Sequence, residues 1–542
     1  MDIQVIKTQP YSDQVCGTSG LRKKVSVFKQ PNYLENFVQS LFNSLDGFEG
    51  KTLIIGGDGR YFNNQAIQSI IKLAIANQFG RLIIGQNGIL STPAASHLIT
   101  KRNAFGGIIL SASHNPGGPN HDFGIKYDTA DGAPAPQSLT DKITEHAKTI
   151  DHYWSVAIKD IKLSEIGEET IGNTVIEIVD SVKDYADYMQ EIFDFDAIRN
   201  LFKNGFKMSY DALNAVTGPY ASYIFETLLG AEEGTVLNKT PLPDFGGLHP
   251  EPNLTYAKHF ADMMYQDDAP DFGAASDGDG DRYMILGKKF FVPPSDSLAI
   301  IAKYMEEIPF YKGKFYGIAR SMPTAPAVDL VAKNKNLPIY ATPTGWKFFS
   351  SLLNAKKISL CGEESFGTGS FHLCEKDGIW AILFWLNIIA ITKKSVQELT
   401  YDLWNEYGRI FTSTQSYEGL DVEPTNNMMS ALRDKLDSLV GQTICNHKII
   451  QTTIFNYTDP VTGDEVKNQG YIIEFENGRI FSRLSGTGSS GATLRLYYSC
   501  KTMDKNLFSL DPIEALDDFI KASNEILQIK EYTGKDAPNV IT

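Results

Sequence analysis

The segment Ser111-Ala112-Ser113-His114-Asn115-Pro116-Gly117-Gly118 directly follows the apolar run from Phe105 to Leu110. An apolar run that ends abruptly in Ser, Asn, Pro and Gly predicts a buried strand that opens into a tight loop. Ser113 then lies at the carboxyl end of a strand, where open α/β sheets gather their ligands. This position makes Ser113 a candidate nucleophile.

The loop allows two other interpretations. A serine beside Asn, Pro and Gly is often present for turn formation alone. A Ser-His-Asp hydrolase does not fit, because His114 is the immediate neighbour of Ser113 and no Gly-x-Ser-x-Gly elbow surrounds it. The rest of the chain has to decide between a turn and a nucleophile.

Composition limits the class of protein. A chain of 542 residues is too long for one core and predicts about three to five domains. The net charge of -15 argues against nucleic acid or an anionic membrane as the main partner. An anionic small molecule stays possible if Arg and Lys are concentrated in particular loops.

Cysteine usage and hydropathy indicate an intracellular protein. The chain has 5 cysteines, an odd number, and none of them are in C-x-x-C spacing. This favours reduced thiols over a zinc site or a set of disulfides. The first residues have no signal-peptide pattern. The longest apolar run, Ile379 to Ile391, is interrupted by Asn387 and is too short for a bilayer, so it predicts a buried helix. We expect a cytoplasmic protein without a membrane span.

Strand and helix patterns alternate along much of the chain. Lys51–Gly56 predicts a strand, residues 64–78 a helix and Arg81–Gly85 the next strand, which is a βαβ order. Similar openings recur at Phe206–Asp211 and Phe315–Arg320. From about residue 395 the pattern changes to one helix followed by β-rich segments. The expected fold class is α/β, with three related α/β domains and a C-terminal α+β domain.

A glycine-rich loop near the start carries three successive cations. Gly17-Thr18-Ser19-Gly20-Leu21 precedes Arg22, Lys23 and Lys24. Such a run is either a solvated surface or an anion-binding site.

Asp277, Asp279 and Asp281 alternate with glycines before a predicted strand. Carboxylates at alternate positions of a tight loop can converge on one hard cation. Arg282 and Lys288 stand where an EF-hand needs Gly and Glu, so the usual calcium loop is excluded. Oxygen ligands alone favour Mg²⁺, and the alternative is a solvated acidic turn.

Two further loops carry polar groups among glycines. Cys361–Ser370 combines Glu363 and Ser365 with glycines, which suits hydrogen bonding to sugar hydroxyls, although ordinary loop formation explains it as well. Arg483–Gly491 contains G-x-G-x-x-G, but a strand pattern follows where a dinucleotide site needs a helix. With Arg495 it instead predicts a phosphate cradle, against the alternative of a flexible Gly/Ser loop.

Together these loops resemble the α-D-phosphohexomutase superfamily, and specifically its eukaryotic phosphoglucomutase branch. The resemblance extends from Gly17–Arg22 to the terminal Ala537-Pro538-Asn539-Val540-Ile541-Thr542. It implies three α/β domains with mixed sheets and a fourth domain around a central cleft. The expected domains are 1–182 with the phosphoserine loop, 183–304 with the metal site, 305–394 with the sugar site and 395–542 with the phosphate site.

The resemblance also implies a role for each matching residue. The matching serine is phosphorylated and donates its phosphoryl group to the sugar, beside Mg²⁺ held by the three aspartates. The expected metal ligands are Ser113, Asp277, Asp279 and Asp281. The expected catalytic residues are Ser113, His114, Lys126, Lys376 and Arg22. The expected substrate-binding residues are Thr18, Arg22, Arg282, Thr344, Gly345, Lys347, Glu363, Ser365, Lys376, Arg483, Ser485, Gly486, Thr487 and Arg495.

The implied activity is a Mg²⁺-dependent interconversion of α-D-glucose 1-phosphate and glucose 6-phosphate by a monomer, with glucose 1,6-bisphosphate as intermediate and activator. Phosphoryl transfer has a loose transition state, so charge neutralisation and positioning carry most of the catalysis. The chain departs from the vertebrate pattern at His121, Phe371, Cys374 and Thr414. An Arg at the Thr414 position would reach toward the cradle. These departures support an alternative, a catalytically weak homologue that acts as a structural or secretion-associated phosphoprotein.

Overall fold

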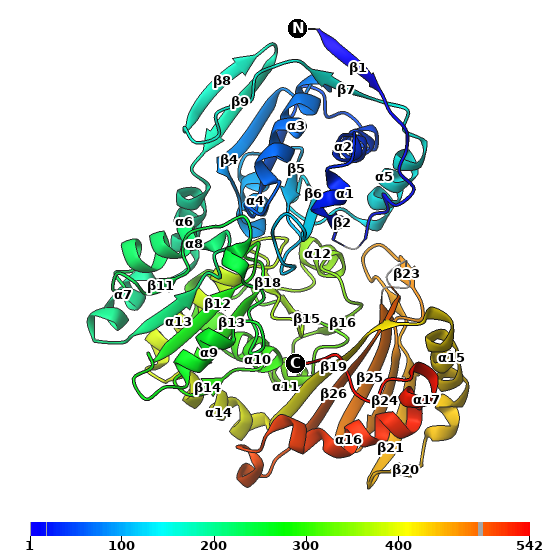
Figure 1. Cartoon of the computed structure of the whole chain (residues 1–542). Helices are drawn as coiled ribbons and strands as arrows, with labels where there is room; N and C mark the ends of the chain where they lie inside the picture. The colour runs from blue at the N-terminus through cyan, green and yellow to red at the C-terminus, as the bar shows by residue number, and fades with distance from the viewer. Residues whose placement is uncertain (1, 18, 486–490) are drawn as a thin grey trace.

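The computed structural model describes residues 2–17, 19–485 and 491–542. Figure 1 shows an N-terminal body at the top, two bodies built on smaller sheets at the lower left and centre, and a C-terminal body at the lower right. Each body contains its own sheet, as the recurring strand patterns predict. The boundaries expected at 182, 304 and 394 stay predictions.

The N-terminal sheet is mixed and contains the loop of Ser113. Its order is β2 (Leu21–Lys24), β6 (Asp122–Thr129), β5 (Gly106–Leu110), β3 (Thr52–Gly57), β4 (Arg81–Ile89), β9 (Thr174–Val179) and β8 (Gly167–Ile171). Strands β5, β3, β4 and β9 are parallel neighbours, and β2, β6 and β8 pair antiparallel. The predicted strand before Ser111 is β5, and all five of its residues are buried. The helices of this part are α1 (Val25–Phe28), α2 (Tyr33–Asn43), α3 (Asn63–Ala76), α4 (Thr92–Lys101) and α5 (Gln137–Thr149), and β1 (Ile3–Lys7) pairs with β7 (His152–Val156) as a separate ribbon.

The predicted βαβ unit is confirmed as β3, α3 and β4, with one difference. Strand β4 continues to Ile89, beyond the predicted end at Gly85, because Gly57 pairs with Ile89 after an irregularity in the ladder. Asp58, Gly59 and Arg60 directly follow β3, at the same sheet edge as the Ser113 loop.

The second sheet carries the aspartate loop. Its order is β11 (Val236–Leu237), β10 (Met208–Asp211), β12 (Phe272–Ser276), β13 (Tyr283–Gly287) and β14 (Phe290–Phe291). Strands β12 and β13 are antiparallel, so the residues between them form a tight turn. The associated helices are α6 (Ser181–Ile192), α7 (Phe195–Lys203), α8 (Thr217–Ala221) with a π-helix (Ser222–Leu228), and α9 (Lys258–Met264).

The third sheet has the order β16 (Ile339–Thr342), β15 (Ile318–Ser321), β17 (Leu360–Gly362) and β18 (Thr368–Ser370). Its helices are α10 (Pro294–Tyr304), α11 (Ala327–Asn334), α12 (Lys347–Asn354) and α13 (Gly378–Thr392). Helix α13 is the predicted apolar helix, and Trp380 and Trp385 on it are fully buried. In the described part of the chain, no helix alone reaches the length and apolarity of a membrane span, and α13 passes that test only together with α14 (Val396–Tyr407), at a bend of 83°.

The C-terminal sheet is antiparallel, with the order β20 (Thr443–Ile444), β21 (His447–Ile454), β24 (Tyr471–Phe475), β25 (Gly478–Ser485), β26 (Ala492–Thr502), β19 (Arg409–Leu420) and β27 (Val540–Ile541). Helices α15 (Val422–Leu439) and α16 (Pro512–Leu527) cover one face, where Leu494 and Leu496 are buried. The alternating side chains of Phe481 and Tyr497 point the other way, toward Met322 of the third body. Short elements complete this part: β22 (Tyr457–Thr458), β23 (Glu465–Val466) and α17 (Ile529–Thr533).

Candidate functional site

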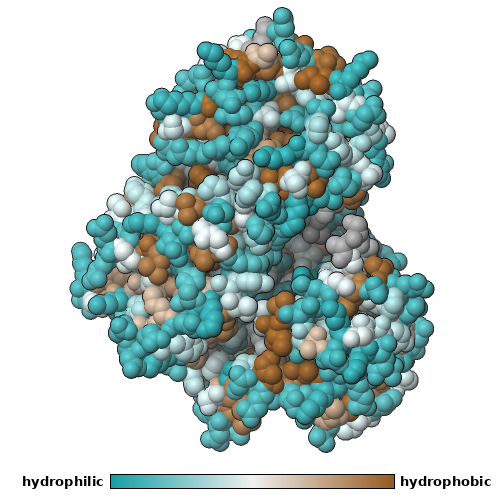
Figure 2. All heavy atoms as spheres, in the orientation of Figure 1, coloured by the Kyte–Doolittle hydropathy of each residue, from teal (hydrophilic) through white to brown (hydrophobic). Residues whose placement is uncertain are grey.

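A cleft of about 790 Å³ is lined by residues from all four sheets or the loops that follow them. Figure 2 shows the molecule hollowed between its upper part and its lower right part. Predicted site residues that line the cleft are Arg22, His114, Lys126, Asp281, Arg282, Thr344, Gly345, Glu363, Ser365, Lys376, Arg483, Ser485 and Arg495. Residues predicted from distant parts of the sequence therefore meet in one cavity.

Ser113 lies below the cleft surface in the loop after β5, with an exposed fraction of 3%. Its φ of 52° is in the left-handed region, which a serine adopts only when its surroundings hold it there. The Ser113 N–H donates to Ser111 Oγ at 2.7 Å, and that hydroxyl donates to Asp58 at 2.7 Å. Arg60 donates to the Ser113 carbonyl at 2.7 Å and pairs with Asp58 at 2.9 Å. The Asp58–Arg60 pair thus fixes the backbone on both sides of the candidate nucleophile.

Burial raises the pKa of Asp58, and the charge of Arg60 opposes that shift. Both side chains are completely buried, so the pair is shielded from solvent. A buried ion pair with further hydrogen bonds holds a fixed geometry at a desolvation cost. This cost is consistent with a role in orienting the loop.

The Ser113 hydroxyl points at the aspartate loop. Its Oγ donates to Asp277 Oδ2 at 2.9 Å, and His114 Nδ1 lies 3.4 Å from the same Oγ. Gly278 is required here, since a Cβ at this position would lie 2.3 Å from the Ser113 carbonyl oxygen. The two loops are therefore packed backbone against backbone.

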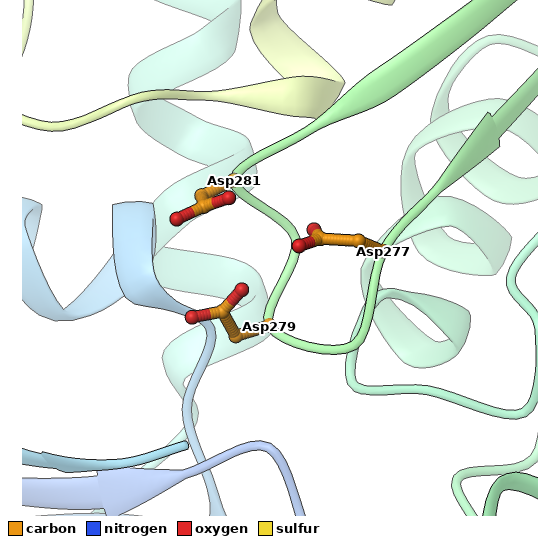
Figure 3. A group of neighbouring side chains, drawn as sticks. All are labelled: Asp277, Asp279 and Asp281. Carbon is orange, nitrogen blue, oxygen red and sulfur yellow. The ribbon is translucent and has the colours of Figure 1, made fainter. Parts of the chain in front are cut away.

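Asp277, Asp279 and Asp281 converge in the turn between β12 and β13, as Figure 3 shows. One oxygen from each carboxylate lies within 4.8 Å of the others, and all three residues are buried. Oδ1 of Asp279 and Oδ1 of Asp281 have no hydrogen-bond partner among the described residues. Buried carboxylates left without partners are costly, and a hard divalent cation would satisfy them. The donor set fits Mg²⁺.

The three carboxylates are not electrically equivalent. Burial, followed by the charges of Asp281 and Asp279, raises the pKa of Asp277 well above its usual value. Burial acts in the same direction on Asp279, but Lys126 and the Thr92 hydroxyl outweigh it and hold the pKa of Asp279 below its usual value. Lys126 Nζ lies 3.0 Å from Asp279 Oδ2, and Thr92 Oγ1 donates to that oxygen at 2.7 Å.

Cations surround the carboxylates on the cleft side. Lys376 Nζ lies 3.3 Å from Asp281 and 3.8 Å from Glu363, and Arg282 lies 3.8 Å from Glu251. Burial would lower the pKa of Lys126 and Lys376, but the neighbouring carboxylates, with Asp279 first for Lys126 and Asp281 first for Lys376, raise both values. Both lysines are therefore protonated at neutral pH.

His114 has the opposite character. Burial, then the charge of Arg282, lowers the pKa of His114 well below its usual value, so the imidazole is neutral. The Nε atoms of Arg22 and Arg282 have no hydrogen-bond partner among the described residues, and Arg282 Nε lies 4.0 Å from Asp281 Oδ1. The cleft therefore offers protonated lysines, a neutral imidazole and unsatisfied guanidinium donors, a set suited to phosphoryl oxygens.

Among the described substrate residues, Lys347 is placed differently from the rest. Lys347 does not line the cleft, and its Nζ donates to Gln137 of the N-terminal body at 2.5 Å. Arg483 lines the cleft and donates to Thr344, which joins the two predicted loops. Thr18, Gly486 and Thr487 lie outside the described residues. The predicted strand after the G-x-G-x-x-G segment is confirmed as β26.

The departures from the vertebrate pattern occupy different surroundings. Thr414 lines the cleft, and its backbone pairs with Thr542 at 2.7 and 3.0 Å. Phe371 stacks on Phe310 beneath the cleft. The Cys374 carbonyl accepts from the Trp346 indole at 3.0 Å, and His121 is exposed.

Sequence reasoning missed a loop of the second body. His249, Glu251 and Tyr256 line the cleft, and the His249 ring stacks on Tyr256 at 3.7 Å. The prolines at 250 and 252 mark this segment as a restrained loop, which is the only signal available in the sequence. Asp58 and Arg60 were also missed, although they follow a predicted strand at the edge that carries Ser113.

Comparison with protein families agrees with this architecture. Models of the phosphoglucomutase/phosphomannomutase alpha/beta/alpha domains I, II and III match residues 13–154, 183–289 and 293–407. A model of the phosphoglucomutase-1 C-terminal domain matches residues 409–539. The chain belongs to the phosphoglucomutase/phosphomannomutase family. The resemblance inferred from the loops is therefore confirmed, as is the four-part α/β fold.

Relatives match over the whole chain. A phosphoglucomutase of Rhizobium radiobacter is 53% identical over 541 residues, and one of Schizosaccharomyces pombe is 50% identical over 554 residues, each covering 100% of both chains. The crystal structure of pp63/parafusin from Paramecium, described as an exocytosis-sensitive phosphoprotein and phosphoglucomutase in an open form, is 46% identical. Its TM-score is 0.93, covering 100% of this chain and 99% of that chain. Like these phosphoglucomutases, the chain is an enzyme, a phosphotransferase that isomerises its substrate.

Proposed function

We propose that this enzyme interconverts α-D-glucose 1-phosphate and glucose 6-phosphate through a phosphoserine at Ser113 and a glucose 1,6-bisphosphate intermediate. The observation that carries the proposal is the 2.9 Å hydrogen bond from Ser113 Oγ to Asp277, one of three converging buried carboxylates. Asp277, Asp279 and Asp281 would hold Mg²⁺ beside the Ser113 phosphate. When bound, Mg²⁺ neutralises the charge of the transferring phosphoryl group.

In the first half-reaction the phosphoryl group leaves Ser113. The bond from phosphorus to Ser113 Oγ breaks while a bond forms to the O6 hydroxyl of glucose 1-phosphate. The neutral imidazole of His114 accepts the hydroxyl proton, and one of the protonated lysines, Lys126 or Lys376, supplies a proton to Ser113 Oγ. Arg22 and Arg282 bind the phosphoryl oxygens through Nε donors that have no hydrogen-bond partner in the described part of the chain.

The second half-reaction reverses the first at the other end of the sugar. The bisphosphate turns over, the bond from phosphorus to O1 breaks, and Ser113 regains a phosphoryl group. Arg483, Ser485 and Arg495 bind the phosphate that is not reacting, and Glu363 and Ser365 bind the sugar hydroxyls. Thr344 and Gly345 line the same cavity, while Lys347 would have to leave Gln137 to take part.

The test is a coupled assay with purified protein, Mg²⁺ and a trace of glucose 1,6-bisphosphate. Glucose, mannose and N-acetylglucosamine 1-phosphates are compared at equal concentrations. We expect the highest kcat/KM on glucose 1-phosphate. A higher kcat/KM on either of the other two sugars would contradict the substrate assignment.

One observation favours a second candidate, a weakly catalytic phosphoprotein associated with secretion. The Paramecium relative is described both as an exocytosis-sensitive phosphoprotein and as a phosphoglucomutase. The presence of Ser113, the three aspartates and the cleft arginines favours the enzyme. The departures from the vertebrate pattern at Thr414 and Cys374 favour the weakly catalytic phosphoprotein. Turnover of glucose 1-phosphate at a kcat below about 0.1 s⁻¹ would favour the second candidate, because typical enzymes reach about 1 to 1000 s⁻¹. The monomeric state and cytoplasmic location stay predictions.

A further inference from the structure

A hydrogen-bonded Ser-His-Asp arrangement lies behind the cleft, in the loop between β18 and α13. His372 Nδ1 lies 2.7 Å from Ser370 Oγ, and His372 Nε2 lies 3.1 Å from Asp377 Oδ2. Ser370 and Asp377 are fully buried, and the Ser370 hydroxyl also contacts the Tyr311 hydroxyl at 2.8 Å. A sealed hydroxyl that already has partners cannot attack a substrate, so this is no hydrolytic site.

Helix α6 completes the arrangement from outside the loop. The Tyr185 hydroxyl donates to Asp377 Oδ1 at 2.6 Å, and the Tyr188 hydroxyl donates to the His372 carbonyl at 2.7 Å. Two ring stacks extend this packing. The Tyr188 ring lies 4.4 Å from the His97 ring of α4, and the His372 ring lies 4.9 Å from the Trp380 ring of α13, measured between ring centroids. The loop is therefore held by α6 of the second body, and Tyr188 of that helix stacks in turn on α4 of the N-terminal body.

This loop carries Lys376, one residue before Asp377. The Asp377 N–H donates to the Thr368 carbonyl at 2.9 Å, and its carboxylate accepts from the Trp380 N–H at 3.0 Å. The next N–H, of Gly378, donates to the Gly280 carbonyl in the aspartate loop at 3.1 Å. The backbone that follows Lys376 is thus fixed to the same loop that carries Asp281, the carboxylate 3.3 Å from Lys376 Nζ.

We propose that Tyr185, His372 and Asp377 are positioning residues that hold Lys376 at its place beside Asp281 and Glu363. None of the three lines the cleft, so they act only through the lysine loop. Their hydrogen bonds are buried, and Tyr185 and His372 both bond to the Asp377 carboxylate. A change in the loop geometry would leave these buried groups without partners, which costs free energy. A misplacement of about 1 Å at a reacting group can cost about 100-fold in rate. The inference rests on the proposed function, since it assigns a role in that reaction.

The decisive variant is Tyr185→Phe, which removes one hydroxyl and leaves the lysine loop unchanged in sequence. We expect kcat for glucose 1-phosphate to fall about tenfold with KM changed less than about twofold, because substrate contacts are untouched. Tyr498→Phe is the matched control, since its buried hydroxyl contacts Ser523 at 2.7 Å in the C-terminal body. The control is expected to keep its kcat.

A double-mutant cycle with Lys376→Gln separates positioning from general damage. If Tyr185 acts through Lys376, adding Tyr185→Phe to Lys376→Gln lowers kcat by less than about twofold. Independent, multiplicative losses would overturn the proposal. Turnover by the wild-type protein is the separate test of the proposed function.

A second measurement does not depend on activity. The rate of reductive methylation of Lys376 is followed by peptide mass spectrometry in the wild type, Tyr185→Phe and Tyr498→Phe. We expect Tyr185→Phe alone to raise the labelling rate of Lys376 several-fold, because the loop is no longer held in place. Equal rates in all three proteins would overturn the proposal even where the cycle is too slow to measure.

Discussion

The two sides of the cleft are held together by different kinds of contact. On the serine side, side chains from different sheets bond directly, as Ser113 to Asp277 and Lys126 to Asp279. On the cradle side, Arg479 of the C-terminal body donates to three successive carbonyls of residues 322–324, at 2.9, 3.3 and 2.5 Å. Arg409 stacks on Trp404 of α14 at 4.6 Å. The serine side is a buried side-chain network, and the cradle side is attached largely through arginine and backbone.

This difference separates the two tasks of the site. In the proposed reaction, the groups that meet the transferring phosphoryl group belong to this side-chain network, so changes there should lower kcat. Arg495 is exposed in the cleft and would bind only the non-reacting phosphate, so its loss should raise KM. The following experiments test this separation.

The largest effect is expected from metal removal. Treatment with a chelator should lower kcat by about three orders of magnitude or more, because charge neutralisation carries most of phosphoryl transfer. Re-addition of Mg²⁺ should restore kcat and raise Tm, since the cation relieves repulsion among three buried carboxylates. Unchanged turnover in protein that metal analysis shows to be free of divalent cations would contradict the account.

Arg495→Ala tests the cradle side. Loss of a charge-assisted hydrogen bond to the non-reacting phosphate should raise the KM for glucose 1-phosphate about 30-fold, with kcat changed much less. Arg433→Ala is the control, because Arg433 is an exposed arginine of the same body whose ion pair in the described part of the chain is with Asp434. If Arg495→Ala instead lowered kcat at constant KM, the proposed separation between a catalytic side and a binding side of the cleft would be contradicted.

Ser111→Ala tests the serine side without touching a reacting atom. It leaves the buried Ser113 N–H without its acceptor and removes a donor from Asp58. We expect kcat to fall about tenfold at constant KM, with a stability loss of about 1 to 3 kcal/mol. Ser40→Ala removes a comparable buried hydroxyl, bonded to the Asn36 carbonyl at 2.7 Å, and should cost stability without lowering kcat.

The smallest effect on activity is expected at the junction with the C-terminal body, where Asp296 accepts from the Trp404 indole at 2.8 Å. Burial raises the pKa of Asp296 from 3.8 to about 7, although Trp404 and Arg409 oppose the shift. The folded protein then holds a proton that the unfolded chain has lost, so this group lowers stability as pH rises from about 4 to 7.

Asp296→Asn should remove that dependence, because an amide oxygen still accepts from Trp404 and does not titrate. The stability of the variant relative to the wild type should increase by about 2 kcal/mol between pH 5 and 7, with kcat unchanged. Denaturant unfolding of both proteins at several pH values measures this difference in unfolding free energy. A difference that stays constant or decreases with pH would contradict the assigned cause.

Local patterns were sufficient to predict the loops that carry Ser113 and the three aspartates, because these loops follow strands or glycine-rich turns, whereas Lys126, Lys376 and Thr344 were expected only from the family resemblance. The strand before Ser111, the aspartate turn and the strand after the G-x-G-x-x-G segment are confirmed. Lys347 was expected among the substrate ligands from the family resemblance, and the structure places its amine on Gln137. The sequence pattern does not indicate which neighbouring body a long side chain contacts.

Contacts between bodies could not be predicted for the same reason. Tyr185 belongs to an amphipathic helix whose pattern shows only that one face is buried. Its partner Asp377 is the N-cap of α13, a local role that indicates no partner on another helix. The hydrogen bond that joins them forms only where α6 of the second body packs against the start of α13 in the third.

The central claim, that Ser113 carries the transferred phosphoryl group, is tested by peptide mass spectrometry after incubation with glucose 1,6-bisphosphate and Mg²⁺. The account predicts a single phosphate on Ser113, lost upon addition of glucose 6-phosphate at a rate no slower than kcat. Steady turnover with Ser113 unmodified throughout, or with the phosphate on a different residue, would contradict it.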